Sequence, residues 1–170
     1  MKIGFIGCVL SSQVALETLL ENNIDYEVVA VITKKKSDFN SDFVDLGSIC
    51  SNSKIPIHYE DSKNKKESLK FMKKYDPDII YCIGWSYLLS SEFLKLCKHG
   101  VIGFHPASLP KNRGRHPIIW SLCLGLKNTS STLFVMEEGA DTGPIIDQID
   151  IKIAKNDNAL TLYKKILSKL

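Results

Sequence analysis

The amino-acid sequence predicts an α/β protein with a mostly parallel, twisted sheet and helices on both of its faces. Short apolar runs rich in β-branched residues recur along the chain, and such runs are typical of strands that are buried on both faces. Stretches with the apolar spacing of a helix separate these runs, which is the pattern of doubly wound parallel sheets. Ligands of such sheets bind at the carboxyl ends of the strands, so the loops that follow the strands are the first place to look for function.

Each expected strand is a continuous run of apolar, mostly β-branched residues. Gly7 ends the first run, and the turn formed by Asp76, Pro77 and Asp78 precedes another. The expected strands cover residues 3–6, 28–32, 55–57, 79–83, 101–105, 132–136 and 145–153.

The expected helices combine an apolar face with a side chain that can cap the first turn. The first is expected to begin at Ser11 or Ser12, and Asn158 is expected to cap the last, which runs to the end of the chain. Residues 65–74 form a charged amphipathic pattern. The other expected helices cover residues 43–49, 90–96 and 117–124.

Length and charge restrict the function classes. With 170 residues, the chain is expected to form one domain over residues 1–170, and its abrupt end in a charged helix leaves a missing C-terminal extension open. A net charge of +3 is too small to indicate a nucleic-acid partner. Lysine runs at 34–36, 63–66 and 73–74 fit either solvated faces or a basic rim that attracts an anionic substrate.

The cysteines predict reduced thiols. None of the five cysteines forms a C-x-x-C pair, so we expect no zinc knuckle, no redox motif and no metal. An odd count without a secretory signal is typical of a cytoplasmic protein, and no apolar stretch approaches the ~20 residues that cross a bilayer. We therefore expect a cytoplasmic protein without a membrane partner.

The segment from His105 to Gly114 carries the most chemical information. A histidine at a strand end, with prolines nearby, can be held still in a cleft and titrates near neutral pH. Asp141 follows later, between Gly139 and Gly143, as in a tight loop that approaches a ligand. If Asp141 reaches His105, the pair can stabilise an oxyanion and relay a proton in acyl transfer. A structural histidine and a turn aspartate are the alternative interpretation.

The order of several motifs resembles the folate-dependent formyltransferase family, which includes methionyl-tRNA, glycinamide ribonucleotide and sugar N-formyltransferases. The family pattern is a Pro-Asp-apolar strand, a glycine turn, a strand that ends in Asn-x-His, Leu-Pro-x-x-Arg-Gly, and Gly-x-Asp-x-Gly. This chain matches in order over nearly its whole length, with Pro77–Asp78–Ile79–Ile80, Gly84–Trp85, His105, Leu109–Pro110–Lys111–Asn112–Arg113–Gly114 and Gly139–Ala140–Asp141–Thr142–Gly143.

The resemblance implies a Rossmann-like formyltransferase domain that uses 10-formyltetrahydrofolate as formyl donor. The family's catalytic histidine and aspartate fall on His105 and Asp141. The folate site would be formed by Ile83, Gly84, Trp85 and Leu88 on one side and by Glu138, Gly139, Ala140 and Asp141 on the other. Trp85 would form one side of the site, against the flat pterin ring. The alternative interpretation is that Trp85 is a partly buried aromatic residue of the core. Residues expected to contact the acceptor are Asn40, Asn112, Arg113 and His116.

One position departs from the family pattern. The family's catalytic asparagine, two residues before the histidine, falls on Gly103. Loss of such an oxyanion donor typically costs about 10²–10³ in rate. We expect either that Asn112 or His116 replaces it or that the chain is a non-catalytic folate-binding relative. We interpret the departure as the mark of a divergent branch.

Elimination favours a nucleotide-linked amino sugar as the small-molecule amine acceptor. A tRNA-directed relative carries a C-terminal domain for which residues 1–170 leave no room, and the loop after the first strand, residues 7–12, lacks the glycines of a purine-pathway phosphate loop. The methionyl-tRNA enzyme's catalytic domain is the alternative. A nucleotide-dependent oxidoreductase is disfavoured because no G-x-G-x-x-G is present. The sequence leaves open whether the protein forms a homodimer.

Overall fold

The computed structural model describes residues 1–22, 24–60 and 65–170 of the chain. Lys63, in one of the lysine runs, lies outside these residues. The chain divides into two compact units, Met1–Ile102 and Gly103–Leu170. The single domain expected over residues 1–170 stays a prediction.

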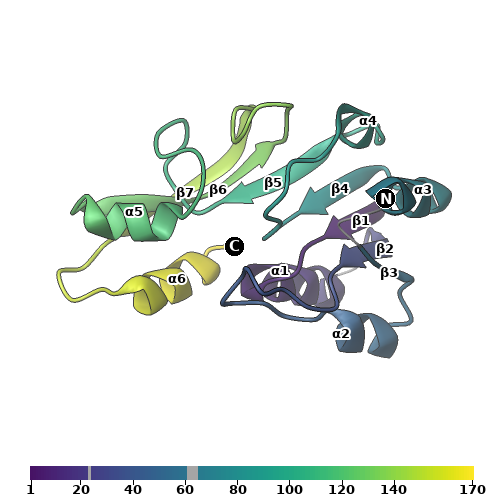
Figure 1. Ribbon diagram of the computed structural model, residues 1–170, viewed down its shortest axis with the longest axis horizontal. Coiled ribbons are helices and arrows are strands. Elements are labelled where there is room, and N and C mark those ends of the chain that lie inside the picture. The colour runs from purple at the N-terminus through teal and green to yellow at the C-terminus, as the bar shows by residue number, and fades with distance from the viewer. Residues whose placement is uncertain (23, 61–64) are drawn as a thin grey trace. The chain divides into compact units, whose positions relative to one another are not determined.

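The first unit is a parallel sheet with the strand order β3-β2-β1-β4 (Figure 1). Helix α1 lies on one side of this sheet and α3 on the other. The core contains fully buried side chains of β1, α1 and β2, among them Phe5, Leu16 and Ile32. The elements of this unit are β1 (Lys2–Ile6), α1 (Leu10–Glu21), β2 (Glu27–Thr33), α2 (Gly47–Asn52), β3 (Ile57–Tyr59), α3 (Lys65–Tyr75), β4 (Ile79–Cys82) and α4 (Ser91–Leu94).

The strand β5 (Val101–His105) passes from the first unit into the second. In the second unit, β6 (Asn128–Val135) pairs with β5 on one side and antiparallel with β7 (Ile145–Lys152) on the other. Helices α5 (Pro117–Cys123) and α6 (Ala159–Leu167) lie side by side (Figure 1). Their apolar faces meet in a cluster of residues from β5, β7, both helices and the segments that follow α5 and β7: Phe104, Ile118, Leu122, Leu126, Ile151, Ile153, Leu162 and Ile166.

Two predicted helix starts are wrong. The helix α1 begins at Leu10, and neither Ser11 nor Ser12 is its N-cap residue. Ser12 lies in the first turn, where its hydroxyl accepts a hydrogen bond from Val9 N at 3.0 Å and donates one to the carbonyl of Ile83 at 2.6 Å. The helix expected over residues 43–49 begins instead at Gly47. Val44 N donates to the carbonyl of Cys8, so this segment bonds to the loop after β1 rather than to a helix of its own.

Strand β3 covers Ile57–Tyr59 and not residues 55–57, and β6 begins at Asn128 and not at residue 132, whereas several other boundaries agree closely with the prediction. Strand β5 covers the predicted residues, and α3 runs from Lys65 to Tyr75 against a prediction of 65–74. Ser90 caps α4 through Phe93 N, and Asn158 caps α6 through Thr161 N. Among the described residues, no helix combines the length and the apolar character that crossing a membrane requires.

Candidate active site

His105 ends strand β5 and is buried, with 5% of its surface exposed. Its Nε2 lies 2.8 Å from the main-chain carbonyl oxygen of Asn112, and its Nδ1 lies 3.5 Å from Oδ2 of Asp141. A carbonyl oxygen only accepts, so Nε2 carries a proton in this arrangement. A second proton on Nδ1 would face a carboxylate, so the imidazolium form is matched by an acceptor at each ring nitrogen.

Asp141 is fixed by the loop that follows β5. The main-chain N–H of Gly114 donates to its Oδ2 at 2.8 Å, and Nε of Arg113 donates to its main-chain carbonyl at 2.8 Å. The backbone of Asp141 is left-handed, with φ of 54°, a conformation that aspartate tolerates better than most residues. Three consecutive residues, Asn112 to Gly114, therefore hold both members of the pair.

Polar side chains of β6 and β7 hold this loop in turn. Thr132 Oγ1 donates to the carbonyl of Ala107 at 2.7 Å, and Gln148 Nε2 donates to the carbonyl of Leu109 at 3.1 Å. The Ser108 and Ser130 hydroxyls are 2.7 Å apart. Buried carbonyls need such partners, because an unpaired buried polar group costs about 1–3 kcal/mol. The hydroxyl-rich strand β6 thus forms the support of the candidate site.

Contacts within the loop already require the glycines around Asp141. A Cβ on Gly139 would lie 2.7 Å from Thr142 Oγ1, and one on Gly143 would lie 1.7 Å from the carbonyl oxygen of Val135. The close approach is therefore made by the loop's own atoms, and it does not require a ligand. Glu138, Gly139 and Ala140 are all exposed.

Gly103 lies in β5, two residues before His105, and is buried. A Cβ at this position would lie 2.8 Å from Cζ of Phe134 and 2.7 Å from Cγ of Met136. The space that a side chain at position 103 would need is therefore filled by the side chains of these two residues.

The segment after β4 carries the residues that were expected to bind folate in the first unit. Ile83 is buried, Gly84 has a left-handed backbone with φ of 67°, Trp85 is half-buried and Leu88 is 64% exposed. A Cβ on Gly84 would lie 2.2 Å from a methyl group of Val9, so this turn requires glycine.

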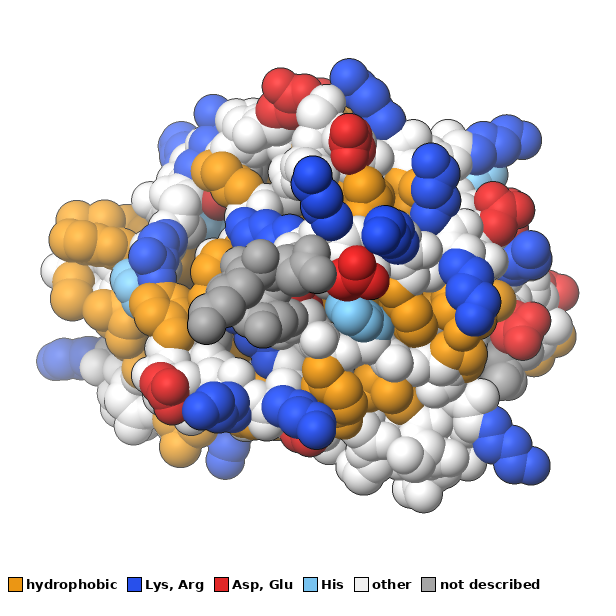
Figure 2. Space-filling model, turned by 45° about the vertical axis from the view of Figure 1, so that its right-hand side comes forward, with side chains coloured by type: hydrophobic (Ala, Val, Ile, Leu, Met, Phe, Trp, Pro, Cys, Tyr) orange, Lys and Arg blue, Asp and Glu red, His pale blue; other side chains and the backbone are white. Residues whose placement is uncertain are grey.

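A lysine sits over the aromatic residues of the same segment. Lys34 Nζ lies 5.3 Å from the centre of the Trp85 ring and 3.9 Å from that of Tyr87. Asn40 Nδ2 donates to Ser86 Oγ at 3.1 Å, so the predicted acceptor residue Asn40 is tied to the predicted folate segment. Figure 2 shows described Lys and Arg side chains interspersed with acidic ones on the visible face.

Cys8 follows β1 at the edge where the strands of the first unit end. Burial raises the pKa of the Cys8 thiol to about 11, against the opposite influence of Lys34. Its Sγ lies 3.8 Å from the carbonyl oxygen of Gly84. The group is therefore a protonated thiol near neutral pH, which removes thiolate attack from the chemistry of this edge.

The residues of the second unit that were predicted to contact the acceptor stay predictions, and the structure shows how Asn112 and His116 are placed. Asn112 presents its main-chain carbonyl to His105, and the role of its side-chain carboxamide as a replacement donor stays a prediction. His116 is exposed and precedes α5, with φ of 58° and no capping hydrogen bond from its side chain. Within the described chain, no contact joins the His116 ring to His105 or Asp141.

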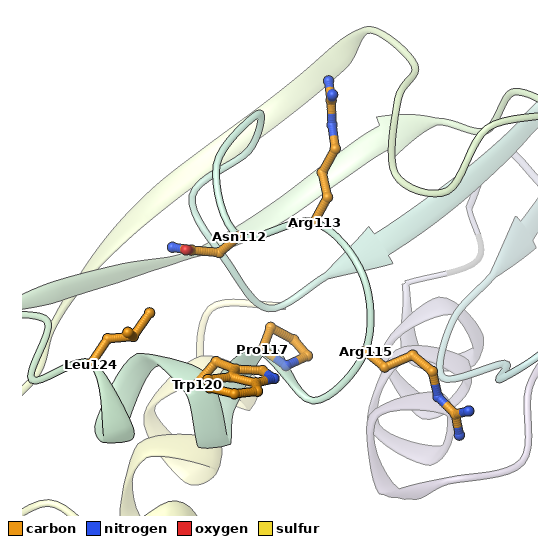
Figure 3. A pocket seen from close by; sticks show the side chains of 6 residues that line it. All are labelled: Asn112, Arg113, Arg115, Pro117, Trp120 and Leu124. Carbon is orange, nitrogen blue, oxygen red and sulfur yellow. The ribbon is translucent and has the colours of Figure 1, made fainter.

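A cavity of about 240 Å³ lies beside this loop, and sequence reasoning missed most of its lining. It is lined by Asn112, Arg113, Arg115, Pro117, Trp120 and Leu124 (Figure 3). Trp120 and Leu124 are 56% and 60% exposed. Their i, i+4 spacing, with Trp120 in the helix and Leu124 at its C-cap, is the signal that could have indicated an apolar surface.

Comparison with known proteins decides the family. Residues 1–169 match the family model described as formyl transferase. This chain belongs to the formyl transferase family. The bifunctional polymyxin resistance protein ArnA of Wigglesworthia glossinidia brevipalpis is 34% identical over 168 residues, which are 97% of this chain and 24% of that protein. The methionyl-tRNA formyltransferase of Thermodesulfovibrio yellowstonii is 37% identical over 112 residues, 66% of this chain and 36% of that protein.

Solved structures of other formyltransferases have the same fold as this member of the family. Phosphoribosylglycinamide formyltransferase from Bacillus halodurans superimposes with a TM-score of 0.86 at 22% identity, over 99% of this chain and 88% of that one. The predicted α/β class with a mostly parallel, Rossmann-like sheet is thereby confirmed. The chain spans between 24% and 55% of the length of the curated relatives that it matches.

Proposed function

We propose that this formyl transferase family member transfers a formyl group from 10-formyltetrahydrofolate to the amino group of a nucleotide-linked amino sugar. The observation that carries the proposal is the buried His105, with an acceptor at each ring nitrogen and with Asp141 clamped beside it. A histidine ring held in this way is suited to acyl transfer.

In the proposed reaction, 10-formyltetrahydrofolate supplies the formyl group. His105 holds a proton at Nε2 and places positive charge where negative charge would develop on the formyl oxygen. Asp141 keeps the ring oriented and balances that charge. The acceptor nitrogen forms a bond to the formyl carbon, and the bond from that carbon to the folate nitrogen breaks. We assign the proton relay to Nε2 of His105, whose proton leaves the carbonyl of Asn112 for the departing nitrogen and is replaced by the proton that the attacking amine loses.

The residues expected to hold the folate fit such a ligand, each segment considered by itself. Trp85 and the exposed Leu88 offer flat and apolar surface to a pterin and its aryl group. The exposed main chain of Glu138, Gly139 and Ala140 offers peptide groups to the hydrogen-bonding edge of a pterin.

The first-strand loop supports the sugar acceptor over a ribonucleotide. The loop of residues 7–12 contains a single glycine, Gly7. A Cβ at Gly7 would lie 2.3 Å from the carbonyl oxygen of Ile83 and 2.4 Å from Ser12 Oγ. This glycine serves the packing of the turn, and the loop has no further glycines with which to cradle a phosphate. Methionyl-tRNA is the rival acceptor, because several relatives are named for it.

The deciding experiment supplies 10-formyltetrahydrofolate and measures tetrahydrofolate release with three kinds of acceptor. The acceptors are a panel of nucleotide-linked amino sugars, methionyl-tRNA and glycinamide ribonucleotide. We expect turnover with one or more of the sugars and at least a hundredfold less with the other two. Preference for methionyl-tRNA would overturn the acceptor but keep the chemistry. Binding of the donor without turnover of any acceptor would favour the alternative hypothesis, suggested by Gly103, that the chain is a non-catalytic folate-binding relative.

A further inference from the structure

The cavity beside the candidate active site lies between the loop after β5 and the exposed face of α5, both in the second unit. Its volume of about 240 Å³ is below the ~300–1,000 Å³ of pockets that take a whole drug-sized ligand. It therefore suits one ring system of a larger molecule.

Asn112 connects this cavity to the catalytic pair. Its main chain is left-handed, with φ of 57°, and its carbonyl oxygen lies 2.8 Å from His105 Nε2. Its carboxamide points away from Arg113 into the cavity, toward Leu124 (Figure 3). Within the described residues, no hydrogen bond holds this carboxamide, so it has a donor and an acceptor to offer a ligand.

The opposite wall of the cavity is apolar and aromatic. Trp120 and Pro117 face the cavity from α5, and Leu124 lies one helical turn after Trp120 (Figure 3). A tryptophan that exposes 56% of its surface beside a proline and a leucine offers a flat stacking surface.

The charge of the loop favours an anion nearby. Lys111, Arg113 and Arg115 lie within five residues, and residues 106–117 contain no aspartate or glutamate. Figure 3 shows the Arg113 and Arg115 side chains directed away from the centre of the cavity, so their charge surrounds the ring site and does not fill it. An anionic group attached to the ring would lie at this basic rim.

We propose that this cavity binds the nucleobase of the acceptor, with the ring stacked on Trp120 and its amide-like edge paired with the carboxamide of Asn112. This inference rests on the proposed function, since it assigns the base of a nucleotide-linked substrate to a subsite. An Asn side chain offers a base edge one donor and one acceptor in a plane, and the basic loop complements the diphosphate.

The test measures binding of UDP, dTDP and GDP to the full chain by isothermal titration calorimetry. Stacking on an aromatic side chain is typically worth ~1–3 kcal/mol, so Trp120→Ala should weaken the nucleotide that binds best by about fivefold or more. Asn112→Ala should weaken it by a similar factor and reduce the preference among bases. Ile119→Ala is the matched control, because Ile119 lies on the same helix, is 48% exposed and does not line the cavity.

A second readout locates the nucleotide. The chain has two tryptophans, so the Trp85→Phe variant reports on Trp120 alone. We expect the nucleotide to quench this fluorescence. Nucleotide binding that Trp120→Ala and Asn112→Ala leave unchanged would overturn the subsite, and so would quenching of Trp120 by folate and not by nucleotide. Nucleotide binding through these residues without formyl transfer would overturn the proposed function and keep the subsite.

Discussion

At the scale of single residues, His105 is the point where the contacts of the candidate site meet. Its ring is held from one side by the carbonyl of Asn112 and faced from the other by Asp141. The Nδ1 to Oδ2 distance of 3.5 Å is longer than an ordinary hydrogen bond, so the positions of both residues depend on the Asn112–Gly114 loop as well as on each other.

His105→Ala and Asp141→Asn should each lower turnover in the formyl-transfer assay by at least a hundredfold. The alanine removes the proton carrier, and the asparagine removes the carboxylate charge while it keeps the oxygen that accepts from Gly114 N. Far-ultraviolet circular dichroism should show an unchanged fold. Rates like the wild type in either variant would contradict the roles.

Gly103→Asn should lower activity and stability. Its Cβ would lie under 3.0 Å from Phe134 and Met136, and Phe134 is a buried ring with little freedom to move. Overpacking of this kind costs about 1–3 kcal/mol, measurable by urea unfolding. Gly103→Ala, which adds the Cβ alone, is the control. A gain in rate of tenfold or more in Gly103→Asn would instead show that the chain has lost an oxyanion donor without replacing it.

Trp85→Ala should weaken donor binding by about tenfold and leave acceptor binding nearly unchanged, because a pterin would stack on the indole. Tyr87→Ala is the matched control, since Tyr87 shares the Lys34 contact and adjoins Trp85 edge to face. Calorimetric titration of each ligand distinguishes the outcomes. Equal losses for donor and acceptor would show that Trp85 only supports the fold.

At the scale of elements, a polar network centred on Asp157 stabilises the start of α6. Asp157 accepts hydrogen bonds from Ala154 N, Thr161 Oγ1 and Lys165 Nζ, and Asn158 caps the helix. The hydrogen bond from Lys165 and then that from Ala154 N lower the pKa of the Asp157 carboxyl. The carboxylate form therefore stabilises the fold.

The sign of the pH dependence follows from this lowered pKa. The contribution is fully present above the pKa of the unfolded carboxyl, about 4, and is lost as the pH falls through the lower folded pKa. Asp157→Asn should therefore be less stable than the wild type at pH 7, and the difference should shrink below pH 3. Urea unfolding at both pH values measures it, with the exposed Asp147→Asn as control. A difference that does not change with pH would contradict the charge-based role.

At the scale of the whole molecule, the thiols reflect how tightly each unit is packed. Cys8, Cys50, Cys82 and Cys97 are buried, whereas Cys123, at the end of α5, is exposed. Burial raises the pKa of Cys8, Cys50 and Cys97 to about 11 and that of Cys82 further. These thiols stay protonated and shielded at pH 8.

An aromatic disulfide reagent at pH 8 should therefore modify Cys123 rapidly and the other thiols only after unfolding. The count of released thiolate, followed by absorbance with and without denaturant, measures this difference. Cys123→Ser should abolish the fast phase. A fast phase that persists in this variant would show that one of the buried cysteines becomes exposed in the native protein.

The sequence by itself determined the α/β class, the order of strands and helices and the residues at the strand ends. Burial periodicity and the end of each apolar run report on them directly, and the formyltransferase motifs picked out His105 and Asp141. The tertiary structure decided how the site is assembled. The position where α1 begins depends on the hydrogen bond from Ser12 to a carbonyl 71 residues away. The need for glycine at position 103 depends on the side chains of Phe134 and Met136, which fill the space beside it. The direction of a main-chain carbonyl, as at Asn112, is set by packing and left-handed backbone geometry, which no local side-chain pattern records.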